Sequence, residues 1–267
     1  MASDNRFAVL IDADNVSVKY IKIILDEISK DGIATYKRIY GDWTNPSLIS
    51  WKSTLLDNSI IPVQQYSYTT GKNSTDSAMI IDAMDILYSG RVEGFCLVSS
   101  DSDFTRLAAR LRESGMTVIG MGESKTPNSF IAACNKFKYL DILSAADEAE
   151  AEEAAPKAAK KLKEEPKAEK EKPAETKKQQ EKAIEEPRTS LRTIRRALRT
   201  IVRENSDEDN WIMVSQVGNL LDKRYTDFDV RNFGFSKLTP FLESLDMFEI
   251  KDMKKDSSSP QKYVRLK

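Results

Sequence analysis

One segment constrains the fold of this chain more than any other, because it cannot bury a core of its own. The stretch from Ala145 to Pro187 consists almost wholly of Ala, Glu, Lys, Pro and Gln, and Leu162 and Ile184 are its only large apolar residues. A segment of this composition cannot bury enough apolar surface to offset the conformational entropy lost on folding. Its four prolines also prevent one continuous helix. We therefore expect a disordered linker over residues 145–187, between domains at 1–144 and 188–267.

The composition excludes several kinds of chemistry. The 267 residues include no histidine and two cysteines, so neither a histidine-dependent triad nor a Cys-rich zinc site is possible. No long apolar stretch typical of a secretory signal stands near Met1. The longest early apolar run, Phe7 to Ile11, is far shorter than the roughly 18 residues of a membrane span. We expect a cytoplasmic protein without a membrane segment.

Residues 1–144 alternate between short apolar runs rich in β-forming residues and amphipathic stretches of helical length. This alternation predicts an α/β fold, with a parallel sheet that carries helices on both faces. The expected strands are Phe7–Ile11, Thr35–Tyr40, Ile60–Gln65, Phe95–Ser99 and Thr117–Met121. The helices that follow them are expected to begin near Ser17, Pro46, Ser74, Ser102 and Asn128.

Acidic residues stand where these strands end, and in such a sheet ligands bind beyond the carboxyl ends of the strands. Asp12 ends the first run, Asp42 follows the second, Asp101 and Asp103 follow the fourth, and Asp76 begins the helix after the third. Carboxylates that meet at one edge repel one another, and a bound hard cation relieves this repulsion. An all-oxygen site suits Mg²⁺ or Mn²⁺, so the sequence predicts a divalent-cation site.

Each of these acids also has an ordinary structural interpretation. Asp76, Asp101 and Asp103 fall in first-turn or N-cap positions, where Asp stabilises free backbone N–H groups. Their joint position at one sheet edge is what favours the cation site. Three further acids, Asp14, Asp82 and Asp85, are expected to be solvent-facing or structural.

Four motifs carry these acids, and together they closely resemble one family. They are Ile11-Asp12-Ala13-Asp14-Asn15, Tyr40-Gly41-Asp42, the segment from Lys72 to Asp76, and the segment from Ser99 to Phe104. They resemble the NYN domain, a branch of the PIN-like nuclease superfamily. The segment from Ser129 to Phe137 is similar to the last helix and closing strand of that family.

The resemblance implies a metal-dependent ribonuclease that hydrolyses RNA phosphodiester bonds with Mg²⁺ or Mn²⁺. It implies that Asp12, Asp42, Asp76 and Asp101 hold the metal, that Asp103 assists, and that Asn15 orients the site or contacts phosphate. Cations can activate water and neutralise phosphate charge, so this chemistry needs no histidine.

The first motif also supports a weaker alternative. Asp12-Ala13-Asp14-Asn15-Val16 is similar to the opening motif of haloacid-dehalogenase-type phosphatases, in which the first Asp is a nucleophile and the second a general acid. However, Asp101-Ser102-Asp103 does not have the spacing of that family's later acidic motif, and nothing resembles its cap domain. A short motif counts only in its structural context.

The part after the linker is basic, with 16 Lys and Arg against 12 Asp and Glu in residues 188–267. Apolar residues recur at helical spacing from Leu191 to Val202, with arginines on the remaining faces. A strand over Trp211–Val214, two helices with Ser215 and Ser236 as N-caps, and a hairpin of Met247–Lys251 with Tyr263–Leu266 complete a winged-helix order.

Two motifs of this part, Trp211 to Gly218 and Asn232 to Leu238, resemble the LOTUS domain, also called OST-HTH. This resemblance implies RNA binding and sometimes protein binding, and its pairing with an NYN domain is a familiar bacterial arrangement. A basic surface of this kind favours contacts with backbone phosphates. The predicted nucleic-acid contacts are Arg192, Arg195, Arg196, Arg199, Lys254 and Lys255 here, and Lys72 and the base-stacking Trp43 in the first domain.

We therefore predict a ribonuclease in which the C-terminal domain captures RNA and the linker supplies reach. A function of another class stays open, in which the acidic edge binds metal poorly and the chain is a non-catalytic RNA-binding adaptor. The aromatic residues of the C-terminal domain are expected in its core rather than on RNA. They are Phe228, Phe233, Phe235, Phe241 and Phe248.

Overall fold

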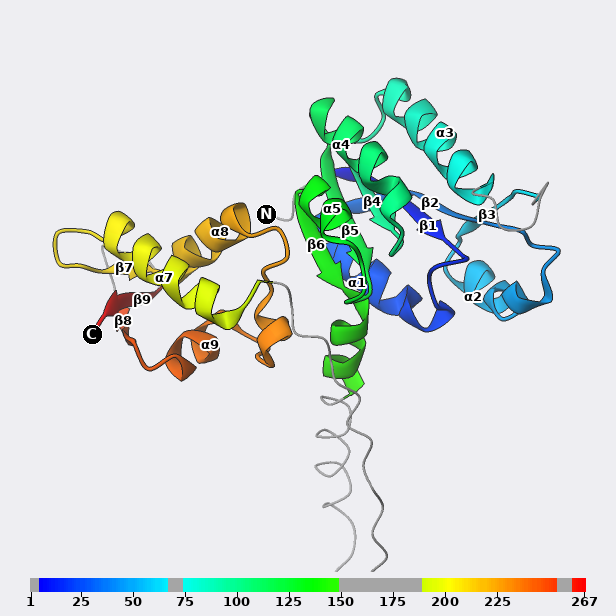
Figure 1. Cartoon of the computed structure of the whole chain (residues 1–267). Helices are drawn as coiled ribbons and strands as arrows, with labels where there is room; N and C mark the ends of the chain where they lie inside the picture. Colours follow the sequence, from blue (N-terminus) through cyan, green and yellow to red (C-terminus); the bar gives the residue numbers. More distant parts are fainter. Residues whose placement is uncertain (1–4, 67–73, 149–188, 254–260) are drawn as a thin grey trace, which may run out of the picture.

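The computed structural model describes residues 5–66, 74–148, 189–253 and 261–267, which form two domains (Figure 1). Residues 140–148 are helical, so this helix continues past the expected domain boundary at residue 144. The rest of the predicted linker, from residue 149, lies outside the described residues. In the described part of the chain, no helix is long and apolar enough to cross a membrane.

The N-terminal domain is built on six parallel strands in the order β3-β2-β1-β4-β5-β6, which confirms the predicted parallel sheet. The five strands expected from apolar runs are present, and no end is shifted by more than two residues. The strands are β1 (Arg6–Asp12), β2 (Ile33–Gly41), β3 (Ile61–Gln64), β4 (Gly94–Val98), β5 (Thr117–Gly122) and β6 (Lys136–Tyr139).

The strand order changes direction next to β1. The chain first adds β2 and β3 on one side of β1, and then returns to place β4 on its other side. In an open parallel sheet, such a switch point leaves a crevice at the carboxyl ends of the strands. The ends of β1 and β4 therefore mark the place where a site is expected.

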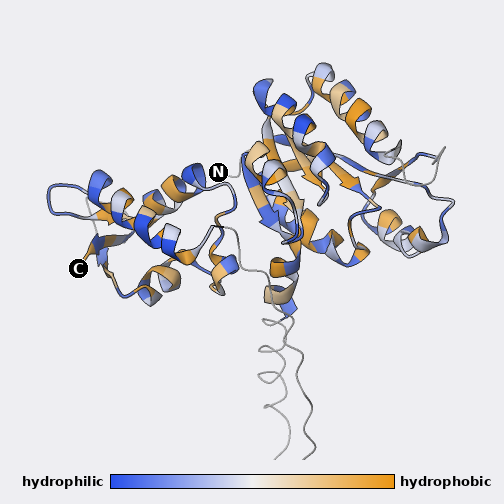
Figure 2. Ribbon diagram, viewed as in Figure 1, coloured by the Kyte–Doolittle hydropathy of each residue, from blue (hydrophilic) through white to orange (hydrophobic). Residues whose placement is uncertain are grey.

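Helices cover both faces of the sheet (Figure 1). Phe7, Val9 and Ile11 of β1 pack on one face, and Ala8 and Leu10 pack on the other, so β1 is apolar throughout. Figure 2 shows the resulting apolar strands between the helices. One face carries α1 (Ile21–Asp31) and α2 (Trp51–Asp57), and the other carries α3 (Ser74–Ser89), α4 (Thr105–Glu113) and α5 (Asn128–Ala133).

The C-terminal domain has the predicted winged-helix order, with an antiparallel sheet of order β7-β9-β8. Phe228, Phe241 and Phe248 are buried, and Phe233 and Phe235 pack against the same core, which confirms their predicted position. The elements are α7 (Leu191–Asn205), β7 (Ile212–Met213), α8 (Val214–Arg224), the 3₁₀ helix η4 (Val230–Phe233), α9 (Leu238–Ser244), β8 (Phe248–Met253) and β9 (Gln261–Leu266).

The two predicted serine N-caps of this domain are wrong. Helix α8 begins at Val214 with Met213 as its N-cap, and α9 begins at Leu238 with Lys237 as its N-cap, and neither N-cap makes a side-chain hydrogen bond. Val214 is buried and Leu238 packs against the domain core. Tertiary packing therefore outweighs local capping preference in setting where these helices begin.

Candidate metal centre

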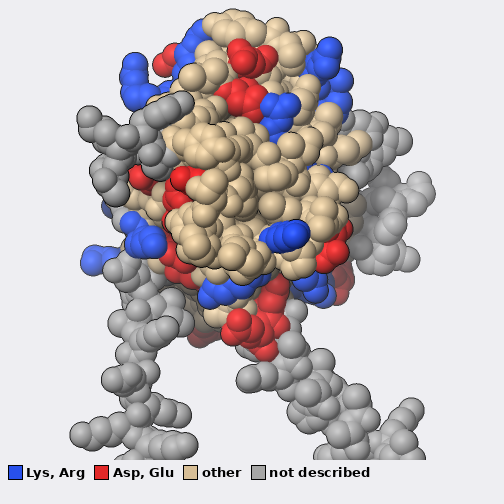
Figure 3. All heavy atoms as spheres, turned by 90° about the vertical axis from the view of Figure 1, so that its right-hand side faces the viewer, with Lys and Arg blue, Asp and Glu red and all other residues tan. Residues whose placement is uncertain are grey.

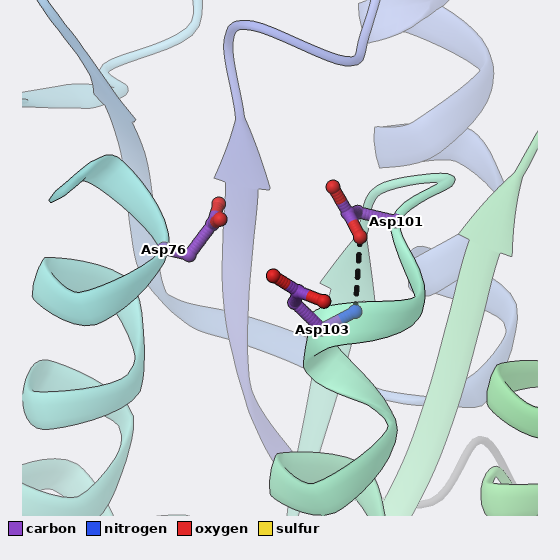
Figure 4. A group of neighbouring side chains, drawn as sticks. All are labelled: Asp76, Asp101 and Asp103. Atoms are coloured by element: carbon purple, nitrogen blue, oxygen red, sulfur yellow. Dashed lines mark hydrogen bonds between the residues drawn. The ribbon is translucent and has the colours of Figure 1, made fainter. Parts of the chain in front are cut away.

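Three carboxylates converge at the switch point of the sheet. Asp76 lies in the first turn of α3, Asp101 follows β4 as the N-cap of the 3₁₀ helix η3 (Ser102–Phe104), and Asp103 lies within η3. One carboxylate oxygen of each lies within 4.8 Å of those of the other two. Figure 4 shows the three side chains pointing toward one another beside the end of β1.

The turn after β4 explains how Asp101 takes part in this group. Its carboxylate Oδ1 accepts the backbone N–H of Asp103 at 2.9 Å, a typical N-cap contact (Figure 4). Its own backbone N–H donates to the Ser99 hydroxyl oxygen at 3.1 Å. Asp101 therefore caps η3 and belongs to the carboxylate group at the same time.

Asp12, a predicted metal ligand, is not part of this group of three; it ends β1, with 1% of its surface exposed. Its carboxylate accepts hydrogen bonds from the side-chain amide of Asn15 at 2.7 Å, the Ser99 hydroxyl at 2.8 Å and the backbone N–H of Asp14 at 3.0 Å. Ser99 therefore joins Asp12 to the turn that holds Asp101. Ser99 was not among the predicted site residues, although it directly precedes the Ser100-Asp101 step at a strand end.

The electrostatics of this group favour a cation. Partial burial, followed by the negative charges of Asp12, Asp101 and Asp103, raises the pKa of Asp76 to about 6. Burial also raises the pKa of Asp12, although its hydrogen bonds from Asn15 and Ser99 oppose the shift. Clustered carboxylate oxygens are the ligands that hard divalent cations prefer, so the residues present fit Mg²⁺ or Mn²⁺.

Asp42 is not brought into this group. It lies at the end of β2, where its Oδ1 accepts the backbone N–H of Thr44 at 3.1 Å and the side-chain amide of Gln64 at 2.9 Å. Its carbonyl oxygen also accepts the backbone N–H of Asn45 at 2.9 Å. The carboxylate thus ties a tight turn to β3. The sequence shows only that Asp42 follows a strand, and this position does not reveal whether its carboxylate faces the other acids or its own turn.

The acids expected to be structural behave as predicted. Asp14 is exposed. Asp82 of α3 contacts the guanidinium of Arg38 and the hydroxyl of Tyr40, both on β2. Asp82 therefore fastens α3 to the sheet and does not join Asp76, which lies on another part of the same helix.

Trp43, a predicted base-stacking residue, is partly buried against the domain core. Its indole N–H donates to the carbonyl oxygen of Val63 at 3.1 Å. Its ring lines an apolar groove of about 550 Å³ together with Leu48, Ile49 and other residues around α2. Figure 3 shows this side of the molecule, where charged residues surround a broad uncharged area. Lys72, Lys254 and Lys255 lie outside the described residues.

The predicted basic surface lies along one face of α7, visible in Figure 2 as its hydrophilic side. Arg192, Arg195, Arg196 and Arg199 are exposed and line a groove of about 700 Å³. Arg203, which was not among the predicted contacts, extends the same groove by one helical turn. Its spacing of four residues from Arg199 could have indicated this. The guanidinium of Arg195 also donates to the Leu245 carbonyl oxygen at 3.0 Å.

Comparisons with known proteins match each domain separately. The family model of the NYN domain matches residues 6–141, and that of the OST-HTH/LOTUS domain matches residues 188–259. A search of curated proteins found no match. Among solved structures, the chain is similar to a protein of unknown function from Vibrio parahaemolyticus RIMD 2210633. The two share 19% identity with a TM-score of 0.43, and the match covers 52% of this chain and 96% of that one.

Proposed function

The chain belongs to the NYN family, with an OST-HTH/LOTUS domain after its NYN domain, and on this basis we propose that it is a metal-dependent ribonuclease that hydrolyses RNA phosphodiester bonds. The observation that carries the proposal is the convergence of Asp76, Asp101 and Asp103 at the switch point of the sheet. A bound Mg²⁺ or Mn²⁺ would supply Lewis-acid activation of water and neutralise charge on the scissile phosphate.

The protein's own residues have distinct roles in this proposal. Asp76, Asp101 and Asp103 hold the cation, and their mutual repulsion in its absence makes binding favourable. Asp12 adds a buried negative charge that acts on Asp76, and the side-chain amide of Asn15 donates to its carboxylate. Asp12 and Asp42, which stand at the ends of neighbouring strands, remain predicted further ligands of the cation.

The arginine face of α7 is proposed to capture RNA. Guanidinium groups bind phosphate oxygens in a bidentate manner, and a row of them along one helix matches a continuous backbone of negative charge. This face lies in a different domain from the carboxylates, so capture and cleavage use separate surfaces. Lys72, Trp43, Lys254 and Lys255 remain predicted additional contacts.

The test is cleavage of end-labelled single-stranded and stem-loop RNA by the full chain in Mg²⁺, in Mn²⁺ and in EDTA. We expect cleavage only with a divalent cation and a loss of at least 100-fold in Asp76→Asn and Asp101→Asn. Asp85→Asn is the matched control, because Asp85 is an exposed acid of the same helix α3. Equal cleavage in Asp85→Asn and Asp76→Asn would reject the proposed site.

One observation favours the adaptor as a second candidate function. The arginine face of α7 is separate from the carboxylates, so RNA binding does not require them. Intact RNA under all metal conditions, with binding retained by the Asp variants, would support this adaptor. The match to the NYN model over residues 6–141 does not support the phosphatase alternative.

A further inference from the structure

The C-terminal domain contacts the exposed edge of the N-terminal sheet. Strand β6 is the last strand of that sheet, so its outer backbone groups need partners. The backbone N–H of Phe137 donates to the carbonyl oxygen of Thr226 at 2.8 Å, directly after α8. The second domain thus supplies a main-chain partner that the sheet itself lacks at this edge.

Four charged residues form a second contact between the domains, the interdomain ion-pair cluster. Glu27 of α1 and Lys138 of β6 come from the N-terminal domain, and Asp229 and Arg231 from the C-terminal domain. The Arg231 guanidinium donates to both carboxylate oxygens of Glu27, at 2.6 and 2.9 Å. The Lys138 ammonium donates to Asp229 at 2.7 Å. Each domain therefore contributes one acid and one base.

The geometry of this cluster fixes the relative orientation of the two domains. Arg231 also donates to both oxygens of Asp229, at 3.0 and 2.8 Å, so its planar guanidinium is held between two carboxylates. Glu27 is only 4% exposed. In the docked chain, loss of the guanidinium would leave this buried carboxylate without its bidentate partner, which is strongly unfavourable.

A third contact involves the point at which the described chain resumes. Asp227, which is 6% exposed, accepts the hydroxyl of Tyr139 at 3.1 Å and the backbone N–H of Thr189 at 3.2 Å. Tyr139 ends β6, directly before the helix at 140–148. Asp227 therefore connects the end of β6 to the beginning of the C-terminal domain.

From these contacts we propose that the C-terminal domain is a permanently docked part of the nuclease, held on β6 by the interdomain ion-pair cluster. The arginine face of α7 and the carboxylate group then keep one relative position. Captured RNA is cut at a fixed distance from the bound element, and the length of the predicted linker does not set that distance. The docking stands on the contacts alone, whereas the fixed cleavage distance rests on the proposed function.

Docking is tested without RNA, in the full chain with a protease site inserted between residues 149 and 188. After cleavage, we expect the two pieces to elute together in size-exclusion chromatography. Arg231→Ala and Glu27→Gln should each weaken their association at least 10-fold. Arg224→Ala, an exposed arginine of α8, is the matched control and should elute like the unmodified protein. Separation of the unmodified pieces at micromolar concentration would overturn the docking.

The two variants lie in different domains, so a folding defect in one leaves the other informative. Circular dichroism of each intact chain identifies such a defect. If Glu27→Gln folds and its pieces associate as tightly as those of the unmodified protein, the ion-pair cluster does not hold the domains.

The fixed distance is tested with a stem-loop RNA that carries a long single-stranded tail. Chains with ten residues added to or removed from 149–188 should cut at the same nucleotides as the unmodified chain. Arg231→Ala and Glu27→Gln should spread the cuts over many positions. Cleavage positions that follow linker length would overturn the proposal. Absence of any cleavage, together with pieces that elute together, would reject the ribonuclease and leave the docking intact.

Discussion

The burial of Asp12 at the end of β1 is electrostatically costly, and the side chains around it reduce this cost. The carboxylate is almost fully removed from solvent, yet three hydrogen bonds stabilise its charged form. Ser99 has a double role, because its hydroxyl donates to Asp12 and accepts the backbone N–H of Asp101. At the residue scale, the Ser99 hydroxyl therefore joins the buried carboxylate of Asp12 to the turn that carries Asp101.

Ser99→Ala should destabilise the protein measurably. The change leaves the buried carboxylate of Asp12 without one donor and the N–H of Asp101 without its acceptor, which costs about 1–3 kcal/mol for a buried group. Urea denaturation followed by circular dichroism at neutral pH measures the difference. Ser102→Ala, three residues further along the chain and exposed, is the control. A Ser99→Ala protein as stable as the control would show that Asp12 does not need this donor.

Asp76 should make the stability of the metal-free protein depend on pH. Its pKa in the folded protein is raised to about 6 from 3.8, so its favourable contribution is complete below about pH 4 and lost as the pH rises through 6. In EDTA, Asp76→Asn should therefore stabilise the fold at pH 7.5 and have little effect at pH 4. A rise from 3.8 to about 6 would amount to about 3 kcal/mol for an unscreened group, at ~1.4 kcal/mol per pKa unit. Because Asp76 is partly exposed, we expect about 1 kcal/mol.

Urea denaturation at the two pH values measures this difference, with Asp85→Asn as the control. If Asp76→Asn destabilised the protein equally at both pH values, the three acids would not repel one another in the metal-free state.

At the scale of whole elements, the sequence predicted what depends on local pattern. The run from Phe7 to Ile11 is apolar because β1 is buried on both faces, and such a run is visible in any sequence. The starts of α8 and α9 were not predictable from Ser215 and Ser236, because packing of Val214 and Leu238 determines them. Strand β6 was expected only from family resemblance, since its alternation over four residues is too short a signal.

Removal of arginines from α7 should weaken RNA binding in a salt-dependent way. Arg196→Ala, Arg199→Ala and Arg203→Ala should each lower the affinity for RNA of any sequence and reduce the slope of log affinity against log salt by about 0.7–1. Arg195 is a poorer choice, because it also bonds to Leu245. Fluorescence anisotropy at several salt concentrations measures the slope. Lys22→Ala, an exposed lysine of α1, is the control, and equal slopes in all variants would exclude α7 as the phosphate-binding surface.

At the scale of the whole molecule, the sequence did not indicate how the domains meet. Glu27, Lys138, Asp229 and Arg231 lie far apart in the chain, and each resembles an ordinary surface charge in its own helix, strand or turn. The composition of residues 145–187 predicted a tether between independent domains. Composition carries no information about contacts that the two domains make elsewhere, so it could not reveal the docking. Interdomain complementarity appears only when both folds are complete, and for this reason it could not be predicted.

The interdomain ion-pair cluster should give Glu27 a distinct pH signature. Burial alone would raise the pKa of Glu27. Three cations face it, Arg231 of η4, Lys30 of α1 and Lys138 of β6, and together they lower its pKa to about 2. Asp229 also pairs with Arg231. A lowered pKa means that the stabilisation is complete above the ordinary value near 4.5 and is lost as the pH falls through 2.

The free energy of unfolding of the unmodified chain should therefore exceed that of Glu27→Gln by a constant amount from pH 5 to 8, and the difference should shrink steadily below pH 4.5. Urea denaturation across this range measures it, with Asp26→Asn, the exposed neighbour of Glu27 in α1, as the control. The difference should also persist in high salt, because buried pairs are screened less than exposed charges. A difference that disappears in high salt at pH 7 would mean that the cluster is open to solvent and that the domains are not firmly docked.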